Sequence, residues 1–431
     1  MRPRVLAFEI STGEGAGFVD VFCGIDWAEG HHDVALVDDT GKLLAKCRIN
    51  DDLDGYRLLL DLLVEHGDSA ETPIPVAIET SRGLLVATLR QGPRQIYAAN
   101  PMAASRYRDR HGVSRKKSDP GDALVLANII RTDAPMHRPL PADTDLAQAV
   151  AVLARAQQDA VWNRQQVANQ LRSLLREYFP AMIEAFRDKQ GTLTRPDARR
   201  ILAVAPTPAL AAKLQMWKLT AMLRRAGRRR GIETDAERIQ QLFREEAPRQ
   251  LPLVEDAMGK QAQALLLQLD AACQAVDDLA RATEEAFRSH PDASIMLSLP
   301  GIGPQVGARI LGEIGDDRTR FATAGGLKAY AGSAPITRAS GKRRYVGRRF
   351  VKNNRLNHVG HLWAFASISG STGAEAHYRR RRAGGDWHMQ ALRHLFNRML
   401  GQFHHCLLAR TPFDESIAFP TQPLRAGTAA R

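Results

Sequence analysis

The stretch FVDVFCGIDWAEGHHDVALVDDTGKLLAKCRI (residues 18–49) predicts three consecutive β-strands. The runs FVDVFCGID, HDVALVD and LLAKCRI are rich in apolar residues, and each has the length of an ordinary strand. DTGK at 39–42 has the composition of a hairpin turn between the second and third runs. A sheet that begins with a β-hairpin is therefore expected.

The residues that follow alternate between helix and strand. DLDGYRLLLDLLVEHG (52–67) has helical spacing and a terminal Gly, and PVAIET (75–80) predicts a short buried strand. We expect a helix over 82–91, a strand at QIYAAN (95–100) and then a helix opened by SDPGDA (118–123). The order β-β-β-α-β-α-β is that of a ribonuclease H-like fold, in which parallel strands continue a hairpin-edged sheet.

Four carboxylates lie where this topology would bring them together. Asp26 ends the first strand, and Glu79 ends the fourth strand, which is expected beside the first. Ligand sites of open α/β sheets form at the carboxyl ends of such strands. Asp119 and Asp122 are three residues apart, so they share one face of their helix. Together the four residues predict a site for divalent metal ions.

Helix capping is an alternative explanation of the last two carboxylates. Asp is a favoured N-cap, Pro120 suits the first helical position, and negative charge at Asp122 complements the helix dipole. Only the convergence of all four carboxylates favours metal binding. Two Mg²⁺ ions about 3.5–4 Å apart stabilise the attacking and leaving oxygens of a phosphodiester, and Mg²⁺ prefers oxygen ligands. We therefore expect Mg²⁺ or Mn²⁺ as the cofactor.

A long helix is predicted over 145–180, and a second helical seam lies downstream. Both seams have the heptad spacing of coiled coils. The first contains Val150, Leu153, Gln157, Ala160, Arg164, Val167, Leu171, Leu174 and Tyr178. The second contains Leu265, Leu269, Ala272, Val276, Leu279, Thr283 and Ala286. The seams could pair as an antiparallel hairpin or join two protomers, and a core-packed helical bundle is an equal alternative.

The other segments are less regular. Residues 190–250, which include the basic run LRRAGRRRG (223–231), predict an irregular helical insertion with a solvated or nucleic-acid-facing patch. RRRR at 379–382 is expected in a flexible basic loop. Residues 1–17 lack the apolar core of a signal peptide, and residues 411–431 have the composition of a disordered tail.

LSLPGIGPQVGARILGEIGD (297–316) places a Gly-x-Gly turn, Gly301 to Gly303, between two helical stretches. This is the helix-hairpin-helix pattern, whose turn offers backbone N–H groups and a helix N-terminus to a DNA phosphate. A tight turn between packed helices is the structural alternative. We favour contact with the DNA backbone.

The segment AGSAPITRASGKRRYVGRRFVKNNRLNH (331–358) is strongly basic. Between residues 337 and 411, only Glu375 and Asp386 are acidic. So one-sided a balance favours phosphate binding over an ordinary solvated face. The candidate phosphate ligands are Lys342, Arg343, Arg344, Arg348 and Arg349.

Ser340 lies within this basic segment, in RASGKRR. A hydroxyl beside Gly and several cations could attack a phosphate as a nucleophile. A plain Ser-Gly turn is the simpler interpretation of this pair taken alone. Ser333 and Thr337 are nearby rivals for the same role.

The composition indicates which class of partner the protein binds and which cellular compartment it occupies. A net charge of +13 points to a polyanionic partner such as DNA. The four cysteines form no CxxC pair, which argues against a zinc ribbon or a disulfide framework and favours a reducing cytoplasm. No apolar run reaches the roughly 18 residues needed to span a bilayer, so no membrane partner is expected.

Taken together, these segments resemble the DEDD transposases of bacterial insertion sequences, a family that includes relatives of the Piv DNA invertase. GIDWAEGHHDVALVD (24–38) and NPMAASRYRDRHGVSRKKSDPGDALVLANII (100–130) are similar to the first and third motifs of that family. LPGIGPQVGARIL (299–311) followed by LKAYAGSAPITRASGKRR (327–344) is similar to its C-terminal domain. The resemblance covers about residues 20–370.

This resemblance implies a RuvC-like nuclease domain in which the four carboxylates form the metal-binding tetrad. It also implies a serine nucleophile, which maps to Ser340, although Ser333 occupies a position that is usually apolar in the family. Members recombine DNA under the direction of a structured RNA encoded by the element. They act as multimers held partly by a coiled coil, so a dimer or tetramer is expected here. The expected location is the bacterial cytoplasm, at the nucleoid.

We therefore expect a RuvC-like domain (18–144), a helical coiled coil with an insertion (145–290), a mainly α C-terminal domain with the helix-hairpin-helix and the serine (291–410), and a disordered tail (411–431). The favoured function is a site-specific DNA recombinase that moves its own element. A junction-resolving nuclease that uses metal-activated water is one alternative. A non-catalytic nucleic-acid-binding protein on an inert scaffold is another.

Overall fold

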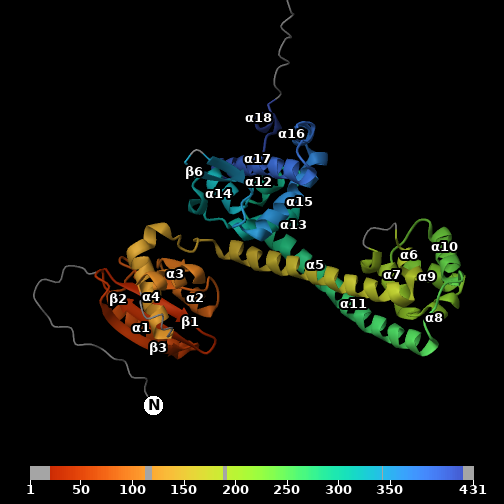
Figure 1. Ribbon diagram of the computed structural model, residues 1–431, viewed down its shortest axis with the longest axis horizontal. Coiled ribbons are helices and arrows are strands. Elements are labelled where there is room, and N and C mark those ends of the chain that lie inside the picture. Colours follow the sequence, from red (N-terminus) through yellow and green to blue (C-terminus); the bar gives the residue numbers. More distant parts are fainter. Residues whose placement is uncertain (1–19, 112–118, 188–191, 342, 421–431) are drawn as a thin grey trace, which may run out of the picture. The chain divides into compact units, whose positions relative to one another are not determined.

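The computed structural model describes residues 20–111, 119–187, 192–341 and 343–420 (Figure 1). The chain divides after Ala142 into two compact units, and each is described by itself.

The first unit contains a mixed five-stranded sheet. Its strands are β1 (Phe22–Trp27), β2 (His31–Val37), β3 (Leu43–Asn50), β4 (Val76–Ile78) and β5 (Ile96–Ala98). Their order across the sheet is β3-β2-β1-β4-β5, with β1 antiparallel to β2 and parallel to β4. The predicted order of strands and helices is confirmed as far as β5, and the first and fourth strands are neighbours as expected.

Helices cover both faces of this sheet. They are α1 (Leu53–Glu65), α2 (Leu84–Leu89), α3 (Pro101–His111) and α4 (Asp119–Asp133), followed by the 3₁₀ turn η1 (Ala134–Met136). Helix α1 begins where Asp52 caps it, because the Asp52 carboxylate accepts a hydrogen bond of 2.8 Å from the Gly55 N–H. Helix α3 was not predicted, since its polar sequence carries little apolar periodicity.

Alternation along the central strands sends neighbouring residues into two different cores. Ile25 of β1 is buried with Leu59 of α1 on one face of the sheet. Ala77 of β4 is buried with Leu126 of α4 on the other face. The face that α4 covers is the one that matters for the carboxylates.

Two long helices, α5 (Asp145–Tyr178) and α11 (Pro252–Arg288), lie side by side in the second unit (Figure 1). Every residue of the two predicted seams is buried or half-buried. Val150 shares one core with Phe287, and Leu171 shares another with Leu269, so the two helices run antiparallel. The seams therefore pair within one chain, which was one of the expected arrangements.

Short helices between α5 and α11 form a core of their own. They are η2 (Thr192–Thr194), α6 (Pro180–Glu184), α7 (Pro196–Val204), α8 (Pro208–Ala212), α9 (Met216–Arg225) and α10 (Ile232–Arg244). Leu202, Leu219 and Ile239 from three of these helices are buried together with Leu171 of α5. The insertion is helical, as predicted, but it is packed rather than irregular.

Part of the basic run in this insertion is structural. Arg228 is largely buried, and its guanidinium donates hydrogen bonds to the carboxylates of Asp197 and Asp235. Arg224 is exposed and forms an ion pair with Glu233. The run therefore offers fewer cations to an external partner than its sequence indicates.

The remaining elements pack around the buried rings of Trp363, Phe396 and Phe403. The helices are α12 (Ala293–Leu297), α13 (Pro304–Ile314), η3 (Arg318–Phe321), α14 (Ala324–Tyr330), α15 (Asn354–Gly370), α16 (Thr372–Ala383), α17 (His388–Ala409) and α18 (Glu415–Ala418). Between α14 and α15, the strands β6 (Ile336–Ser340) and β7 (Arg343–Gly347) form an antiparallel hairpin.

Two expectations for the end of the chain differ from the structure. RRRR at 379–382 lies in helix α16 and not in a flexible loop. Residues 411–420, expected to be disordered, pack against the C-terminal helices: the Glu415 carboxylate accepts a hydrogen bond of 2.8 Å from the Gly373 N–H. Residues 421–431 lie outside the described part of the chain. In that part, no helix combines the length and apolarity needed to cross a membrane.

Candidate functional site

The ends of β1 and β4 bring two of the predicted carboxylates to adjacent positions. Ile25 pairs with Ile78 across these parallel strands, and Asp26 and Glu79 each follow one residue later. Both carboxylates are half-buried. The strand ends therefore meet at one edge of the sheet, as the sequence predicted.

Close packing of α4 on Gly24 shows which face of β1 carries Asp26. A Cβ added to Gly24 would lie 2.0 Å from the Ala123 carbonyl oxygen and 2.3 Å from the Ala127 nitrogen. Because side chains alternate along a strand, Asp26 lies on the same face as Gly24. Ala77 of β4 also packs against α4, and Glu79 follows the last residue of that strand. Asp26 therefore lies on the side of the sheet that α4 covers, and Glu79 lies just beyond the end of the neighbouring strand.

Asp122 lies on α4 directly before Ala123, the residue that contacts Gly24. Its side chain is buried, with 6% of the residue exposed, and Arg108 of α3 forms an ion pair with it at 2.5 Å. Asp119 opens α4, but its side chain lies outside the described residues. Among the side chains that are described, no three of the His, Cys, Asp and Glu residues form a group that could hold a metal ion.

A further carboxylate, Asp33, was missed by the sequence analysis. Asp33 is the antiparallel partner of Asp26 in the sheet, so both side chains project to the same face. It is 4% exposed, and the Arg48 guanidinium donates to its two oxygens at 2.7 and 3.1 Å. The signal was an acidic residue directly before the apolar run VALV of the second strand.

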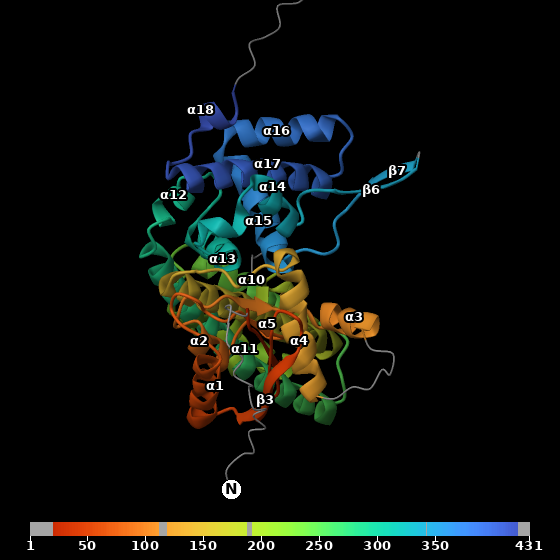
Figure 2. The same ribbon diagram turned by 90° about the vertical axis from the view of Figure 1, so that its left-hand side faces the viewer.

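The hairpin of β6 and β7, here called the ribbon (Ile336–Gly347), is the second candidate feature. Figure 2 shows it extending away from α14 and α15. Ser340 pairs with Arg343 across the turn at Gly341, whose φ of +54° suits glycine. From Thr337 to Val346, every described residue of the ribbon is exposed. Lys342, the next residue in the sequence, lies outside the described residues.

The three candidate hydroxyl groups differ in accessibility. Ser340 and Thr337 are exposed on the ribbon. Ser333 is only 3% exposed, and its hydroxyl donates to the Asn397 side-chain oxygen at 3.0 Å and is 3.3 Å from the Lys328 carbonyl. Ser333 is therefore buried and hydrogen-bonded in the interior, whereas Ser340 is accessible to a large substrate.

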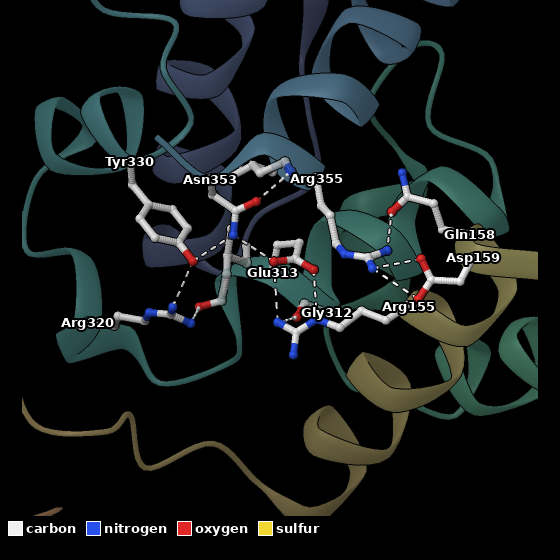
Figure 3. A network of polar contacts seen from close by, with 11 residues as sticks. Arg155, Gln158, Asp159, Gly312, Glu313, Arg320, Tyr330, Asn353 and Arg355 are labelled. Carbon is white, nitrogen blue, oxygen red and sulfur yellow. Dashed lines mark hydrogen bonds and ion pairs between the residues drawn. The ribbon is translucent and has the colours of Figure 1, made fainter. Parts of the chain in front are cut away.

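A network of polar contacts holds the two ends of the ribbon segment together (Figure 3). The Asn353 N–H donates to the Tyr330 carbonyl at 2.8 Å, and the Asn353 amide donates to the Tyr330 hydroxyl at 2.8 Å and to Glu313 at 2.6 Å. Glu313 is 5% exposed and also accepts two hydrogen bonds from Arg155 of α5. The base of the ribbon is thus anchored to α13 and to the long helix α5.

Cations crowd the helices near the ribbon. Burial lowers the pKa of His361, and Arg393 and other cations lower it further. Burial and the neighbouring Arg398 lower the pKa of His377 to about 4. Arg348 lies over the exposed ring of Phe350, while Arg349 is half-buried. Burial is the first cause of both shifts, and the cations that add to them are groups that attract phosphate.

The Gly-x-Gly turn is explained partly by packing. Gly301 has a φ of +79°, and a Cβ there would lie 2.6 Å from the Ser367 nitrogen of α15. The Trp363 indole N–H donates to the Pro300 carbonyl at 2.9 Å. Gly303 is exposed at the N-terminus of α13, with no atom within 4 Å of an added Cβ. Only the Gly303 end of the turn is therefore open to an external phosphate.

Comparison with known proteins matches both parts of the chain. A family model of DEDD transposases from IS110 elements covers residues 23–180, and a model described as the transposase of the IS116/IS110/IS902 family covers residues 293–379. The chain is 70% identical to the "Mini-circle putative transposase for IS117" of Streptomyces coelicolor, over 93% of this chain and 96% of the relative. It is 28% identical to an uncharacterized 44.8 kDa protein of the insertion element IS116 of Streptomyces clavuligerus, over 88% and 92% of the two chains.

Proposed function

The chain belongs to the IS116/IS110/IS902 family of transposases, and on that premise we propose that it cuts and rejoins DNA with a carboxylate metal site and a serine nucleophile. A transposase of a bacterial insertion sequence cleaves and joins DNA, so the chemistry is phosphoryl transfer. One observation carries the proposal above all. Ser340 is exposed on a basic ribbon, in a stretch without a single acidic residue from 337 to 374.

The first unit, in this proposal, has a RuvC-like, ribonuclease H-like fold. Its support is the sheet order β3-β2-β1-β4-β5, with an antiparallel hairpin on one side of β1 and parallel strands on the other. The same topology supports a functional role for Asp26 and Glu79, since ligand sites form at the carboxyl ends of neighbouring parallel strands.

The donor set of this unit suits Mg²⁺ or Mn²⁺. Asp26, Glu79, Asp119 and Asp122 would hold the ions, and all four offer the oxygen ligands that these ions prefer. Arg108, which pairs with Asp122, would have to release that carboxylate. When bound, the ions would offset the negative charge that develops on the oxygens of the phosphate.

Ser340 would attack the scissile phosphorus of the DNA backbone. A bond forms between the serine Oγ and phosphorus, and one P–O bond of the backbone breaks. The proton lost by the serine hydroxyl ends on the released deoxyribose oxygen, so the step is balanced. Attack on the phosphoserine by the deoxyribose hydroxyl of another strand end reverses the same chemistry and joins the DNA.

The basic surface would hold the nucleic acid during these steps. The phosphate contacts would come from Lys342, Arg343, Arg344, Arg348 and Arg349. The N-terminus of α13 at Gly303 would contact the DNA backbone. An element-encoded guide RNA and a dimer or tetramer are also part of the proposal, supported by the family resemblance. Because α5 and α11 bury their seams against each other, contacts between protomers would use other residues of these helices.

The test is a covalent-adduct assay with Mg²⁺ and a labelled duplex that carries one end of the element, with the transcript of the adjacent non-coding DNA present. The wild type should form a protein–DNA adduct that survives denaturing electrophoresis. Ser340→Ala and Asp26→Asn should both abolish it, whereas the control Ser333→Ala should retain it.

Other outcomes identify the rival functions. Cleavage by Ser340→Ala but not by Asp26→Asn, without any adduct, would identify a nuclease that uses water. Binding that persists in EDTA, with no strand breaks in Mg²⁺ or Mn²⁺, would identify a non-catalytic binding protein.

A further inference from the structure

The strand register divides the ribbon into two chemically different faces. Residues that pair across antiparallel strands project to the same side, and alternate residues share a side. The face that carries the serine, here called the serine face, consists of Arg338, Ser340, Arg343 and Tyr345. The opposite face consists of Thr337, Ala339, Arg344 and Val346. Two adjacent arginines, Arg343 and Arg344, thus point in opposite directions.

Both faces of the ribbon lack a protein partner in the described part of the chain. Tyr345 is 64% exposed on the serine face, and Val346 is 54% exposed on the opposite face. A two-stranded hairpin of this kind is marginally stable alone in water. It does have the dimensions of an element that enters the major groove of duplex DNA. Its charge selects a polyanion as the occupant.

We propose that the serine face of the ribbon receives the scissile strand, with Arg343 as the ligand of the phosphate that Ser340 attacks. This inference rests on the proposed function and assigns the phosphate contact to one of two neighbouring arginines. Arg343 is the direct cross-strand partner of Ser340, and such partners have Cβ atoms about 5 Å apart. Its guanidinium donates hydrogen bonds in the paired geometry that matches two phosphate oxygens.

Tyr345 and Arg338, the next pair along the serine face, would contact the adjoining nucleotide. The Tyr345 ring lies over Gly347, where an added Cβ would be 2.5 Å from the ring. An exposed aromatic ring beside a phosphate ligand is a suitable surface for stacking on a base. Arg344, on the opposite face, would contact phosphates other than the scissile one.

The first test compares Arg343→Gln with Arg344→Gln, which remove the same charge from adjacent positions on opposite faces. We expect Arg343→Gln to slow adduct formation on the order of 100-fold at saturating DNA, the effect of removing one donor from a transition-state oxyanion. Arg344→Gln should raise the DNA concentration needed for the half-maximal rate, because it removes a phosphate contact, and should lower the rate at saturating DNA much less than Arg343→Gln does. Arg343→Lys should recover part of the rate, because it restores the charge but not the paired donors.

The second test needs no catalysis. Arg343→Cys and Arg344→Cys are made in a Cys47→Ser chain, because Cys23, Cys273 and Cys406 are buried and Cys47 is only half-buried. DNA with the element end should protect the introduced thiol from a maleimide much more in Arg343→Cys than in Arg344→Cys. Thermal melting of each variant verifies that the fold is retained.

The combined outcomes separate this inference from the proposed function. Equal rate losses for Arg343→Gln and Arg344→Gln, or equal protection of the two introduced thiols, would overturn the assignment of the serine face even if Ser340 is the nucleophile. Absence of an adduct from the wild type, with selective protection at position 343, would overturn the serine chemistry and leave the face assignment supported.

Discussion

Arg108 of α3 forms an ion pair with the buried carboxylate of Asp122 at 2.5 Å. The pair places a guanidinium on one of the four residues that the proposed metal site needs. Arg108 thereby compensates a buried negative charge whenever no cation is bound, since an unpaired carboxylate there would be costly. A metal ion that binds Asp122 would have to replace this guanidinium, and the effect of that replacement on stability can be measured.

Replacing Arg108 with Gln should couple the stability of the first unit to metal. Loss of the guanidinium leaves Asp122 buried and poorly paired, so we expect a destabilisation of about 1–3 kcal/mol in EDTA. Mg²⁺ should raise the melting temperature of Arg108→Gln more than that of the wild type. The control is Arg57→Gln, which breaks an exposed ion pair with Asp54 and should cost less than about 1 kcal/mol. Equal Mg²⁺ shifts in all three proteins would contradict the role of Asp122 as a ligand.

Replacing Gly24 with Ala should separate α4 from the sheet. The added Cβ would fall 2.0 Å from the backbone oxygen of Ala123, and a helix backbone cannot yield as a flexible side chain can. We expect a loss of about 1–3 kcal/mol or more in a urea titration, together with impaired DNA cleavage. Gly30→Ala is the matched control, because nothing lies within 4 Å of its added Cβ. A Gly24→Ala protein as stable as Gly30→Ala would contradict the observed packing.

Replacing Glu313 with Gln should loosen the base of the ribbon. Glu313 is buried and accepts hydrogen bonds from both Arg155 and Asn353. Its hydrogen bond with Arg155 is the main reason why the pKa of Arg155 is raised. We expect a loss of about 1–3 kcal/mol and faster proteolysis near the ribbon. Asp159→Asn is the control, since it breaks the exposed ion pair with Arg355, shown in the same network in Figure 3. Its cost should stay below about 1 kcal/mol. Similar losses in the two variants would contradict the anchoring role.

The stability of the second unit should fall in mild acid. Burial and nearby arginines lower the pKa of His377 from 6.5 to about 4, so the unfolded chain takes up a proton before the folded chain does. Stability should be complete above about pH 6.5 and should decline towards pH 4. The measurement is the melting temperature between pH 7.5 and 4.5 for the wild type and His377→Gln. His361 and His394 have lowered pKa values too, so the variant should flatten the decline only in part. A wild-type melting temperature that rises as the pH falls would contradict this account.

Much of the local structure could be predicted from residue patterns. Strands β1 to β5 and helix α5 were predicted within a few residues, because alternation and heptad spacing are local properties of the chain. Asp26 and Glu79 were predicted as neighbours because they end strands that this topology places side by side. Helix α3 was not predicted, and its Arg108 could not be assigned to Asp122, because that ion pair depends on how two helices pack.

The residue pattern was sufficient for strands β1 to β5, for helix α5 and the seam of α11, for the acid-poor basic segment and for a turn at Ser-Gly. Four features were decided only by the tertiary structure. They are the face of β1 and β4 against which α4 packs, the burial of Ser333, the pairing of α5 with α11 in one chain, and the opposite directions of Arg343 and Arg344. The physical reason is that periodicity depends on neighbours in sequence. Burial, ion pairing and cross-strand register depend on residues that meet only when distant segments pack.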